Sequence, residues 1–481
     1  MNYKVISYVL SKIMGIEAIV LLLPLMVAFY YREGNYLCFL IPILICAAIG
    51  VLSLFLKPKD KRIYAKEGFV IVGLAWIFMS LAGALPAYLS GAIPSYIDSF
   101  FETVSGFTTT GATILNAIEG LPKGVLFWRS FTHWLGGMGV LVFLIAIVPK
   151  SDTATMHLVR AESTGPKIGK LTSKLNVSAR ILYTIYTVLT VILVLLLLIG
   201  GMPFFDSVVT AFGTAGTGGF AVKNASIAAY NSPYITYVIS IFMTLFAVNF
   251  SMFYFMILGK FGMVFRNEEL RTFLLIIFVS VGIISFNIYP LYNNAEMSFR
   301  DALFQVTATI STTGFSTADF VKWPYLSQGI LLMLMFFGGC AGSTGGGMKI
   351  IRIIMLVKST SKDVRKMLSP RSVLTVKVDK KPVEASVLTG LKVYLMAYLI
   401  VLVTSVLLIC INNFDMTTNI TSVITCLNNV GPGLGDLIGP TGNFSSFSVL
   451  SKIVLCFDML AGRLDIFPVL VLLTPTTWKM K

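Results

Sequence analysis

Long apolar stretches separated by short polar segments run along almost the whole chain. Seven of them contain no charged residue and exceed the roughly 20 residues that a helix needs to cross a bilayer. Three more carry only isolated charges. The pattern therefore predicts an all-α polytopic membrane protein with about ten transmembrane helices, at 5–30, 36–56, 68–97, 124–149, 181–205, 224–259, 272–295, 323–348, 393–414 and 446–473.

Composition supports this class. Of 481 residues, 56% are hydrophobic and only 12% are charged, against roughly 25% charged in a typical soluble domain. Mean hydropathy is +0.85. A soluble protein of this size would lack the polar side chains to cover its surface, so we expect lipid to cover it. Soluble enzymes, secreted disulfide scaffolds and disordered tails are excluded, and no cluster of acid–base or metal-binding residues indicates a membrane enzyme.

The net charge of +15 reflects orientation. With ten spans, 29 of the 37 basic residues fall on one side, including both termini, and seven fall on the other. Because basic residues accumulate in cytoplasmic loops, we expect both termini in the cytoplasm. The excess charge therefore needs no nucleic acid partner. The basic loops 150–180 and 349–392 have two readings, as orientation signals and as docking surfaces for a cytosolic regulator.

Three segments on the outer side share one template, and a fourth follows it weakly. In the first three, an Asp lies thirteen residues before a Gly and a Thr lies two before that Gly. In the fourth, a Thr takes the place of the Asp. These pairs are Asp98 and Gly111, Asp206 and Gly219, Asp301 and Gly314, and Thr418 and Gly431. Each copy lies between two predicted spans, which predicts four span–loop–span repeats.

The repeats divide the chain into five units. We expect four pore repeats in a pseudo-fourfold arrangement, preceded by an N-terminal helix pair. The units are 1–66 for the pair, 67–176 for repeat 1, 177–262 for repeat 2, 263–385 for repeat 3 with an intramembrane loop, and 386–481 for repeat 4.

Each repeat predicts a re-entrant loop. The Asp or Thr is expected to cap a short helix of about ten residues, which cannot span the bilayer. The Thr/Gly-rich segment after it would be tolerated at membrane depth if it lined water or were buried in protein. Four such segments around one axis would present rings of carbonyl oxygens that can replace the hydration shell of an alkali cation. The alternative for any single copy is an ordinary outer turn.

The four loop sequences resemble the pore loops of the Trk/Ktr/HKT superfamily, and the chain is most similar to its TrkH-type members. The segments are Phe107-Thr-Thr-Thr-Gly-Ala-Thr113, Gly216-Thr-Gly-Gly-Phe220, Ser311-Thr-Thr-Gly-Phe315 and Asn428-Asn-Val-Gly-Pro-Gly-Leu-Gly435. The resemblance implies potassium (K+) uptake, a homodimer with one pore per subunit, and a cytosolic nucleotide-binding regulatory subunit of the TrkA type. A serine at the first filter glycine is associated with sodium, so Gly111 implies potassium.

The resemblance also implies which residues bind the ion. They are Thr109, Thr110, Gly111, Gly218, Gly219, Thr312, Thr313, Gly314, Asn429, Val430 and Gly431. The fourth loop departs from the pattern, because Asn429 and Val430 replace two threonines and Pro432 follows the glycine. The strength of selectivity therefore stays open at this point.

A glycine-rich run at 338–347 interrupts a long apolar segment. We expect it to break the helix and form a gating loop below the filter, with a small-residue helix-packing face as the alternative. Lys349 after it either repels cations or marks the cytoplasmic boundary. Arg463 lies inside the last span and needs a partner, either carbonyls of this loop or Asp458. The predicted gating residues are Gly338, Gly339, Gly342, Gly345, Gly346, Gly347, Lys349 and Arg463.

Two points stay open from sequence. An ion-coupled secondary transporter, a symporter of potassium with protons or sodium, is the alternative function. It is disfavoured because all four repeats run in the same direction rather than as inverted pairs. Glu17 in the first span is either a proton site or a partner in an intersubunit hydrogen bond. His133 and His157 receive no role.

Overall fold

The computed structural model describes every residue except 57, 59–62, 140–174, 373 and 479–481. The described part is almost entirely helical, with a single short hairpin formed by β1 (Lys377–Val378) and β2 (Lys381–Pro382). The basic loop 150–180 and the end of the predicted span 124–149 lie largely outside the described residues, so neither is assessed.

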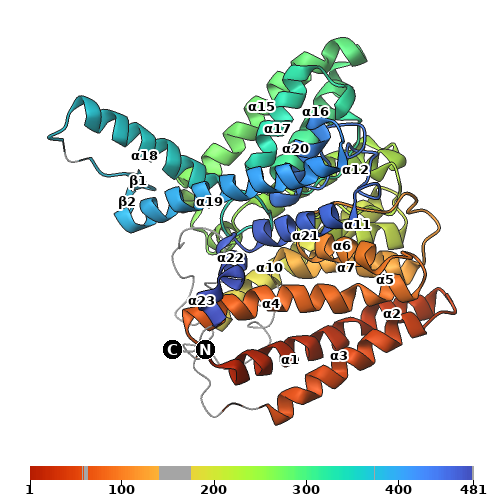
Figure 1. Ribbon diagram of the computed structural model, residues 1–481. Coiled ribbons are helices and arrows are strands. Elements are labelled where there is room, and N and C mark those ends of the chain that lie inside the picture. The colour runs from red at the N-terminus through yellow and green to blue at the C-terminus, as the bar shows by residue number, and fades with distance from the viewer. Residues whose placement is uncertain (57, 59–62, 140–174, 373, 479–481) are drawn as a thin grey trace.

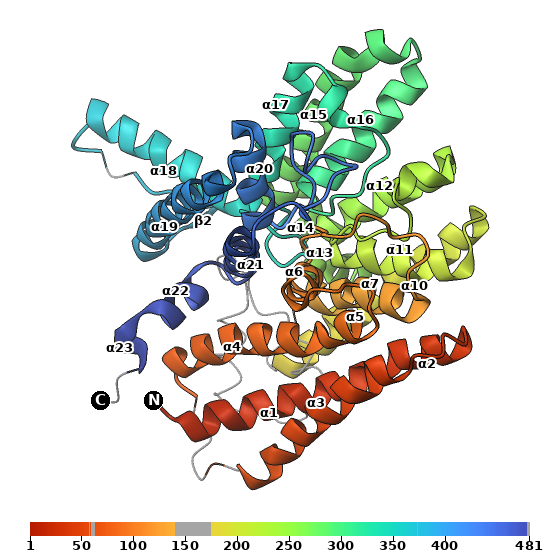
Figure 2. The same cartoon turned by 45° about the vertical axis from the view of Figure 1, so that its right-hand side comes forward.

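The predicted N-terminal pair is present. It consists of α1 (Tyr3–Val20), continued by α2 (Leu22–Tyr30), and α3 (Leu37–Phe55). The two long helices cross closely where Gly50 faces Gly15, because a Cβ at Gly50 would lie 2.7 Å from the Gly15 Cα. Figures 1 and 2 show this pair as an outer layer against α4.

Four units follow with the same order of elements: a long helix, a short helix, and a second helix. The long helices are α4 (Ala65–Gly83, extended by α5, Leu85–Leu89), α10 (Leu175–Ile199), α15 (Glu268–Tyr292) and α19 (Ala385–Ile409). The short helices are α6 (Tyr96–Phe107), α11 (Phe204–Gly216), α16 (Ala295–Ile310) and α20 (Met416–Leu427). The second helices are α7 (Lys123–Gly137), α12 (Pro233–Ala247), α17 (Tyr325–Phe336) and α21 (Val449–Arg463).

Shorter elements connect or extend these helices. They are the 3₁₀ turns η1 (Ser226–Tyr230), η2 (Phe320–Lys322) and η3 (Cys410–Asn412), and the helices α13 (Phe250–Ile257), α14 (Phe261–Phe265), α18 (Ile350–Leu368), α22 (Phe467–Leu473) and α23 (Pro475–Trp478).

By length and composition, six of the described helical segments can cross a membrane, or seven if the bent pair α12–α13 counts as one. The chain is therefore a multi-pass membrane protein, and the total of ten spans stays a prediction. The span predicted within 224–259 is not one straight helix, because the chain bends by 93° between α12 and α13. The last span is also broken, between α21 and α22, where Asp465 and Ile466 have positive φ.

The two chain ends lie at the same end of the helices (Figure 1). The hydroxyl of Tyr3 donates to the carbonyl of Trp478 at 3.0 Å, and Lys66 Nζ donates to the carbonyl of Thr476 at 3.1 Å. Helix α18 and the β hairpin project from the same side of the molecule in Figure 1. The even number of crossings stays a prediction.

Candidate functional site

The four short helices end in the same backbone motif. In each loop, a residue one or two positions beyond the end of the helix takes the left-handed conformation. These residues are Thr109 (φ +57°), Thr217 (+54°), Thr312 (+59°) and Asn429 (+55°). Each of these N–H groups bonds to the carbonyl three residues back, and the next N–H bonds five residues back. This is a Schellman ending, which satisfies the last carbonyls of a helix.

Three of these left-handed residues are threonines. A β-branched residue rarely adopts positive φ, and left-handed geometry costs an L-residue about 1–2 kcal/mol. Such strain persists only where surrounding structure over-determines it, and it is concentrated at functional sites. Its repetition at one position of successive repeats marks the segments after these helices as a candidate site.

Two residues further on, each loop places a glycine with positive φ against the next loop. A Cβ at Gly111 would lie 2.1 Å from the carbonyl oxygen of Gly218; the equivalent distances are 2.0 Å from Gly219 to Thr313, 2.0 Å from Gly314 to Val430, and 2.7 Å from Gly431 to Thr110. All four are below any real Cβ contact, so only glycine fits. Loop 1 thus abuts loop 2, loop 2 abuts loop 3, loop 3 abuts loop 4, and loop 4 returns to loop 1.

These contacts join segments far apart in sequence into a closed ring. The residue between the two positive-φ residues has negative φ in every loop, so handedness alternates along each segment. The groups that face the glycines are neutral backbone carbonyls, whose oxygens are hard ligands of the kind that suit an alkali cation. The predicted filter residues of all four loops therefore lie together in one ring.

The fourth loop keeps this geometry despite its different sequence. Asn429 takes the left-handed position, and its side-chain amide donates to Thr110 Oγ1 and to the Met459 carbonyl, both at 2.9 Å. Pro432 packs beside Gly314, whose Cβ would lie 2.7 Å from the proline Cδ. Asn429 thus joins the last loop to the first, which a threonine at this position could not do with the same reach.

The predicted helix caps are wrong. Ser95, Asn294 and Asp415 cap their helices by accepting from backbone N–H groups, and Pro203 precedes α11 without a side-chain cap. Asp98, Asp206 and Thr418 lie three residues after those caps. Asp301 lies seven residues after its cap, beyond the first turn of α16. Asp98 and Asp206 lie in the first turn of their helices, where an acid interacts favourably with the helix dipole without capping.

The same acids tie each short helix to its surroundings. Asp98 pairs with Lys452 Nζ at 2.7 Å, Asp206 accepts from the Tyr230 hydroxyl at 2.8 Å, and Asp301 accepts from Thr317 Oγ1 at 3.1 Å. These contacts account for the repeated acids structurally.

The glycine-rich segment between α17 and α18 lies directly against the filter loops. The N–H of Gly346 donates to Thr312 Oγ1 at 2.7 Å, and a Cβ at Gly346 would lie 2.8 Å from the Asn429 Cβ. A Cβ at Gly338 would lie 2.0 Å from the carbonyl oxygen of Gly346, so the beginning and the end of this segment pack against one another. The glycine-rich run therefore interrupts the helix, as predicted, and lies next to loops 3 and 4, while its gating role stays a prediction.

Further bonds hold this segment, which we call the intramembrane loop (337–349). Cys340 N–H donates to the Ala247 carbonyl at 2.9 Å, at the break between α12 and α13. The buried Glu269 accepts from the N–H groups of Ala341 at 2.7 Å and Ile351 at 3.2 Å. Lys349 is buried and donates back to the carbonyls of Gly345 and Gly346. Lys349 therefore fastens the loop to itself.

Arg463 contacts backbone carbonyls. Its guanidinium donates to Thr344 of the intramembrane loop at 2.9 Å and to Gly136 and Gly137, at the end of α7, at 2.5 and 2.7 Å. The carboxylate of Asp458 accepts from the Ser405 hydroxyl at 2.7 Å. The loop-carbonyl interpretation of Arg463 is therefore the one the contacts support.

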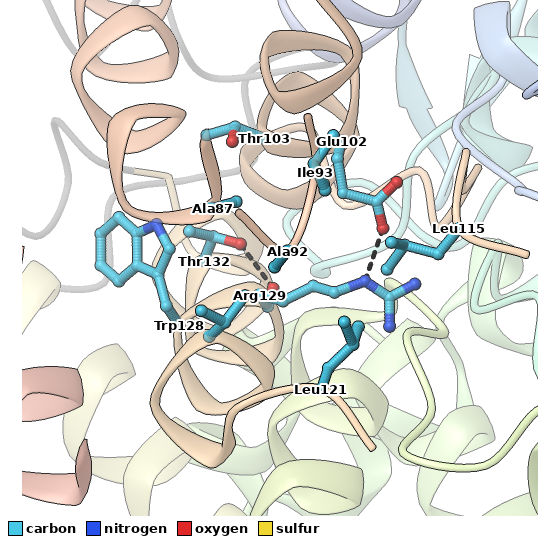
Figure 3. Close-up of a pocket in the computed structure, with 11 residues that line it drawn as sticks. Ala87, Ala92, Ile93, Glu102, Thr103, Leu115, Leu121, Trp128, Arg129 and Thr132 are labelled. Atoms are coloured by element: carbon cyan, nitrogen blue, oxygen red, sulfur yellow. Dashed lines mark hydrogen bonds and ion pairs between the residues drawn. The ribbon is translucent and has the colours of Figure 1, made fainter. Parts of the chain in front are cut away.

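Sequence reasoning missed a polar cluster behind loops 1 and 2. Glu102 on α6 and Arg129 on α7 form an ion pair at 2.5 Å, with both side chains 5% exposed. Figure 3 shows the two side chains pointing toward one another, beside Leu115 and Leu121. Removing either partner would leave a buried charge, at a cost of about 3–5 kcal/mol. The available signal was the presence of one acid and one base of opposite charge in the middle of two neighbouring repeat-1 helices.

Arg129 also joins the outer segments of repeats 1 and 2. It donates to Thr113 Oγ1 and to the Ala221 carbonyl, both at 3.1 Å, and lies 3.7 Å above the Phe220 ring. Glu102 accepts in addition from the Thr113 hydroxyl and the Ile114 N–H, both at 2.9 Å. The cluster therefore supports both segments where they leave the ring.

Several helices long and apolar enough to cross a membrane, together with four related loops that pack in a ring, are typical of a membrane transport protein. Comparison with known proteins agrees: residues 37–479 match the TrkH family of cation transport proteins, and the chain belongs to that family. This is a family of transporters and not of enzymes.

The relatives match over their full length. The chain is 35% identical over 485 residues to "Trk system potassium uptake protein TrkH" of Escherichia coli (strain K12), covering 100% of both. It is 30% identical over 483 residues to "Trk system potassium uptake protein TrkG" of the same strain, covering 99% of each. The crystal structure of the potassium transporter TrkH from Vibrio parahaemolyticus superimposes with a TM-score of 0.89 at 32% identity, covering 100% of both chains.

Proposed function

We propose that this chain takes up potassium across the bacterial inner membrane through a filter of backbone carbonyls. The observation that carries the proposal is the closed ring in which each loop glycine meets a carbonyl of the next loop. Four neutral oxygens around one axis can replace the hydration shell of K+ without a fixed negative charge. The inside-negative membrane potential would draw the cation inward, by about 2.3 kcal/mol per charge per 100 mV.

The intramembrane loop is the proposed gate. It bonds to a filter residue at Thr312 and to the break between α12 and α13, and Arg463 fastens it to the last span. Movement of this loop away from the filter would open the path toward the cytoplasm. The positive charges of Lys349 and Arg463 lie in this region and would oppose cation passage while the loop is in place.

The proposed assembly is a homodimer, with one pore per subunit and both termini in the cytoplasm. A cytosolic nucleotide-binding subunit of the TrkA type would control the loop. Helix α18 begins at the end of the intramembrane loop and projects with the β hairpin from the molecule (Figure 2). A subunit bound to α18 could therefore move the intramembrane loop directly.

Uptake of rubidium into proteoliposomes tests the proposal. With an imposed inside-negative potential, we expect uptake that excess sodium does not inhibit and unlabelled potassium does. Uptake that proceeds without a potential but requires a proton or sodium gradient would instead support the symport alternative. Equal inhibition by sodium and potassium would contradict a potassium-selective filter.

A further inference from the structure

Loop 2 lacks the hydroxyl pairs that brace loops 1 and 3. In loop 1, Thr108 Oγ1 and Thr110 Oγ1 lie 2.8 Å apart, and in loop 3 Ser311 Oγ and Thr313 Oγ1 lie 2.7 Å apart. Each pair links the C-cap residue of the short helix to the residue before the filter glycine. The equivalent positions of loop 2 are glycines, at 216 and 218, so this loop has no such brace.

His133 occupies the space that those side chains would fill. A Cβ at Gly218 would lie 2.3 Å from both Cγ and Nδ1 of the imidazole, and a Cβ at Gly216 would lie 2.2 Å from the His133 carbonyl oxygen. His133 is fully buried and comes from α7 of repeat 1. The imidazole therefore explains Gly218, and the backbone of His133 explains Gly216.

The imidazole uses both nitrogens. Nδ1 donates to the Gly106 carbonyl of α6 at 2.7 Å, and Nε2 accepts from the backbone N–H of Phe220 at 3.3 Å. A carbonyl can only accept and an amide N–H can only donate, so these partners dictate the neutral tautomer with its proton on Nδ1. The imidazole thus connects the short helix of repeat 1 to the residue that follows the filter glycine of loop 2.

Phe220 is held on both sides. Its ring lies 4.2 Å from the His133 ring and 3.7 Å from the Arg129 guanidinium, and Arg129 is fixed by Glu102. The carbonyl of Gly218, two residues before Phe220, is the one that faces Gly111. A shift of Phe220 would therefore move the Gly218 carbonyl and change the contact between loops 1 and 2.

We propose that His133 is a positioning residue for ion selectivity, replacing in loop 2 the hydroxyl brace of loops 1 and 3. It acts through the Phe220 N–H, which sets the position of the Gly218 and Gly219 carbonyls. This inference rests on the proposed function in that it assumes the ring selects ions. The hydrogen bond itself is independent of that assumption and has its own readout.

Two substitutions separate the bonds of the imidazole. The side-chain oxygen of His133→Gln reaches the Nε2 position and keeps an acceptor for the Phe220 N–H. The amide nitrogen of His133→Asn reaches the Nδ1 position and keeps only the donor to Gly106. A backbone hydrogen bond contributes roughly 0.5–1.5 kcal/mol, so its loss corresponds to up to about tenfold. We expect His133→Asn to lose about this much rubidium-over-sodium discrimination and His133→Gln to stay within about twofold of wild type.

Amide hydrogen exchange of the peptide covering 216–222 gives the second readout, in the full-length protein in detergent. Exchange should accelerate in His133→Asn and remain near wild type in His133→Gln, while the melting temperatures of the two variants stay close. If His133→Asn and His133→Gln showed the same exchange rate and the same ion discrimination as each other, the positioning role would be overturned. This holds whether both variants match wild type or both lose protection and discrimination. If wild-type protein shows no cation uptake, the exchange result still decides the role of His133, and the proposed function alone fails.

A compensation experiment adds a steric test. Gly218→Ala should reduce folded yield because its Cβ meets the imidazole, and the double variant with His133→Ala should recover yield without recovering selectivity. A Gly218→Ala variant that is equally tolerated with and without His133 would contradict this packing.

Discussion

Arg463 donates a hydrogen bond to the carbonyl oxygen of Thr344 at 2.9 Å, joining the last span to the middle of the intramembrane loop. The same guanidinium holds the end of α7 through Gly136 and Gly137. One side chain of repeat 4 therefore connects repeats 1 and 3. A gate that opens by moving the loop must break this connection.

Arg463→Ala should raise the resting flux of rubidium in proteoliposomes. Charge-assisted hydrogen bonds contribute roughly 1.5–3 kcal/mol, so losing the Thr344 bond alone favours the released loop by about tenfold or more. Arg463→Lys is the matched control, because it keeps the charge and loses the forked geometry. A rise in both variants would indicate that tethering dominates, and a rise in Ala alone that charge dominates. Unchanged flux in Arg463→Ala would contradict both roles.

Thr312→Val should also raise resting flux. The substitution keeps the β-branched shape and removes the oxygen that accepts from the Gly346 N–H at 2.7 Å. The expected weakening of loop docking is about 1–3 kcal/mol, because a buried donor is left without a partner. The control is Thr217→Val at the equivalent position of loop 2. The Thr217 hydroxyl donates to the carbonyl of its neighbour Gly216 and not to the intramembrane loop. Similar flux from the two variants would argue against docking through Thr312.

Gly219→Ala should abolish or strongly reduce discrimination between potassium and sodium. Its φ is +76° and the new Cβ would lie 2.0 Å from the Thr313 carbonyl oxygen, so loops 2 and 3 must separate. Gly111→Ser is expected to act in the same way at the junction of loops 1 and 2. Gly329→Ala is the control, since it lies in α17 with nothing within 4 Å of the added Cβ. Competition of sodium against rubidium uptake measures the effect, and unaltered competition in Gly219→Ala would disprove a contact ring.

Arg352→Gln and Asp465→Asn should each lower the melting temperature, and the double variant should lose less than the sum. The two side chains form a bidentate pair at 2.5 Å, 10% and 23% exposed, between the start of α18 and the break after α21. Breaking a largely buried pair costs about 3–5 kcal/mol when one charge is left alone. Melting temperatures in detergent of wild type, the two single variants and the double variant form a double-mutant cycle. Strictly additive decreases in melting temperature would mean that the two residues are not coupled.

Much of this architecture was predictable from repetition and hydrophobicity. The spacing from Asp to Gly located the four loops, and the glycine-rich run located the break after α17. The same spacing misled on the caps, because it fixes a distance to the glycine and not the residue at which each helix begins. For Asp98 and Asp206 an acid is favourable anywhere in the first turn. The break at Val248 and Asn249 was not predicted, since no glycine or proline marks it and a hydrophobicity window averages across it.

The sequence by itself determined that the chain lies in a membrane, that it contains four related loops, and that glycine is required in each of them. Only the tertiary structure decided which loop meets which, that His133 substitutes for a missing hydroxyl pair, and that Arg463 bonds to carbonyls of two other repeats. The physical reason is that local periodicity records burial and backbone conformation within one segment. The closed ring depends on contacts between residues of different repeats, such as Asn429 and Thr110, which lie 319 positions apart, and no local pattern encodes them.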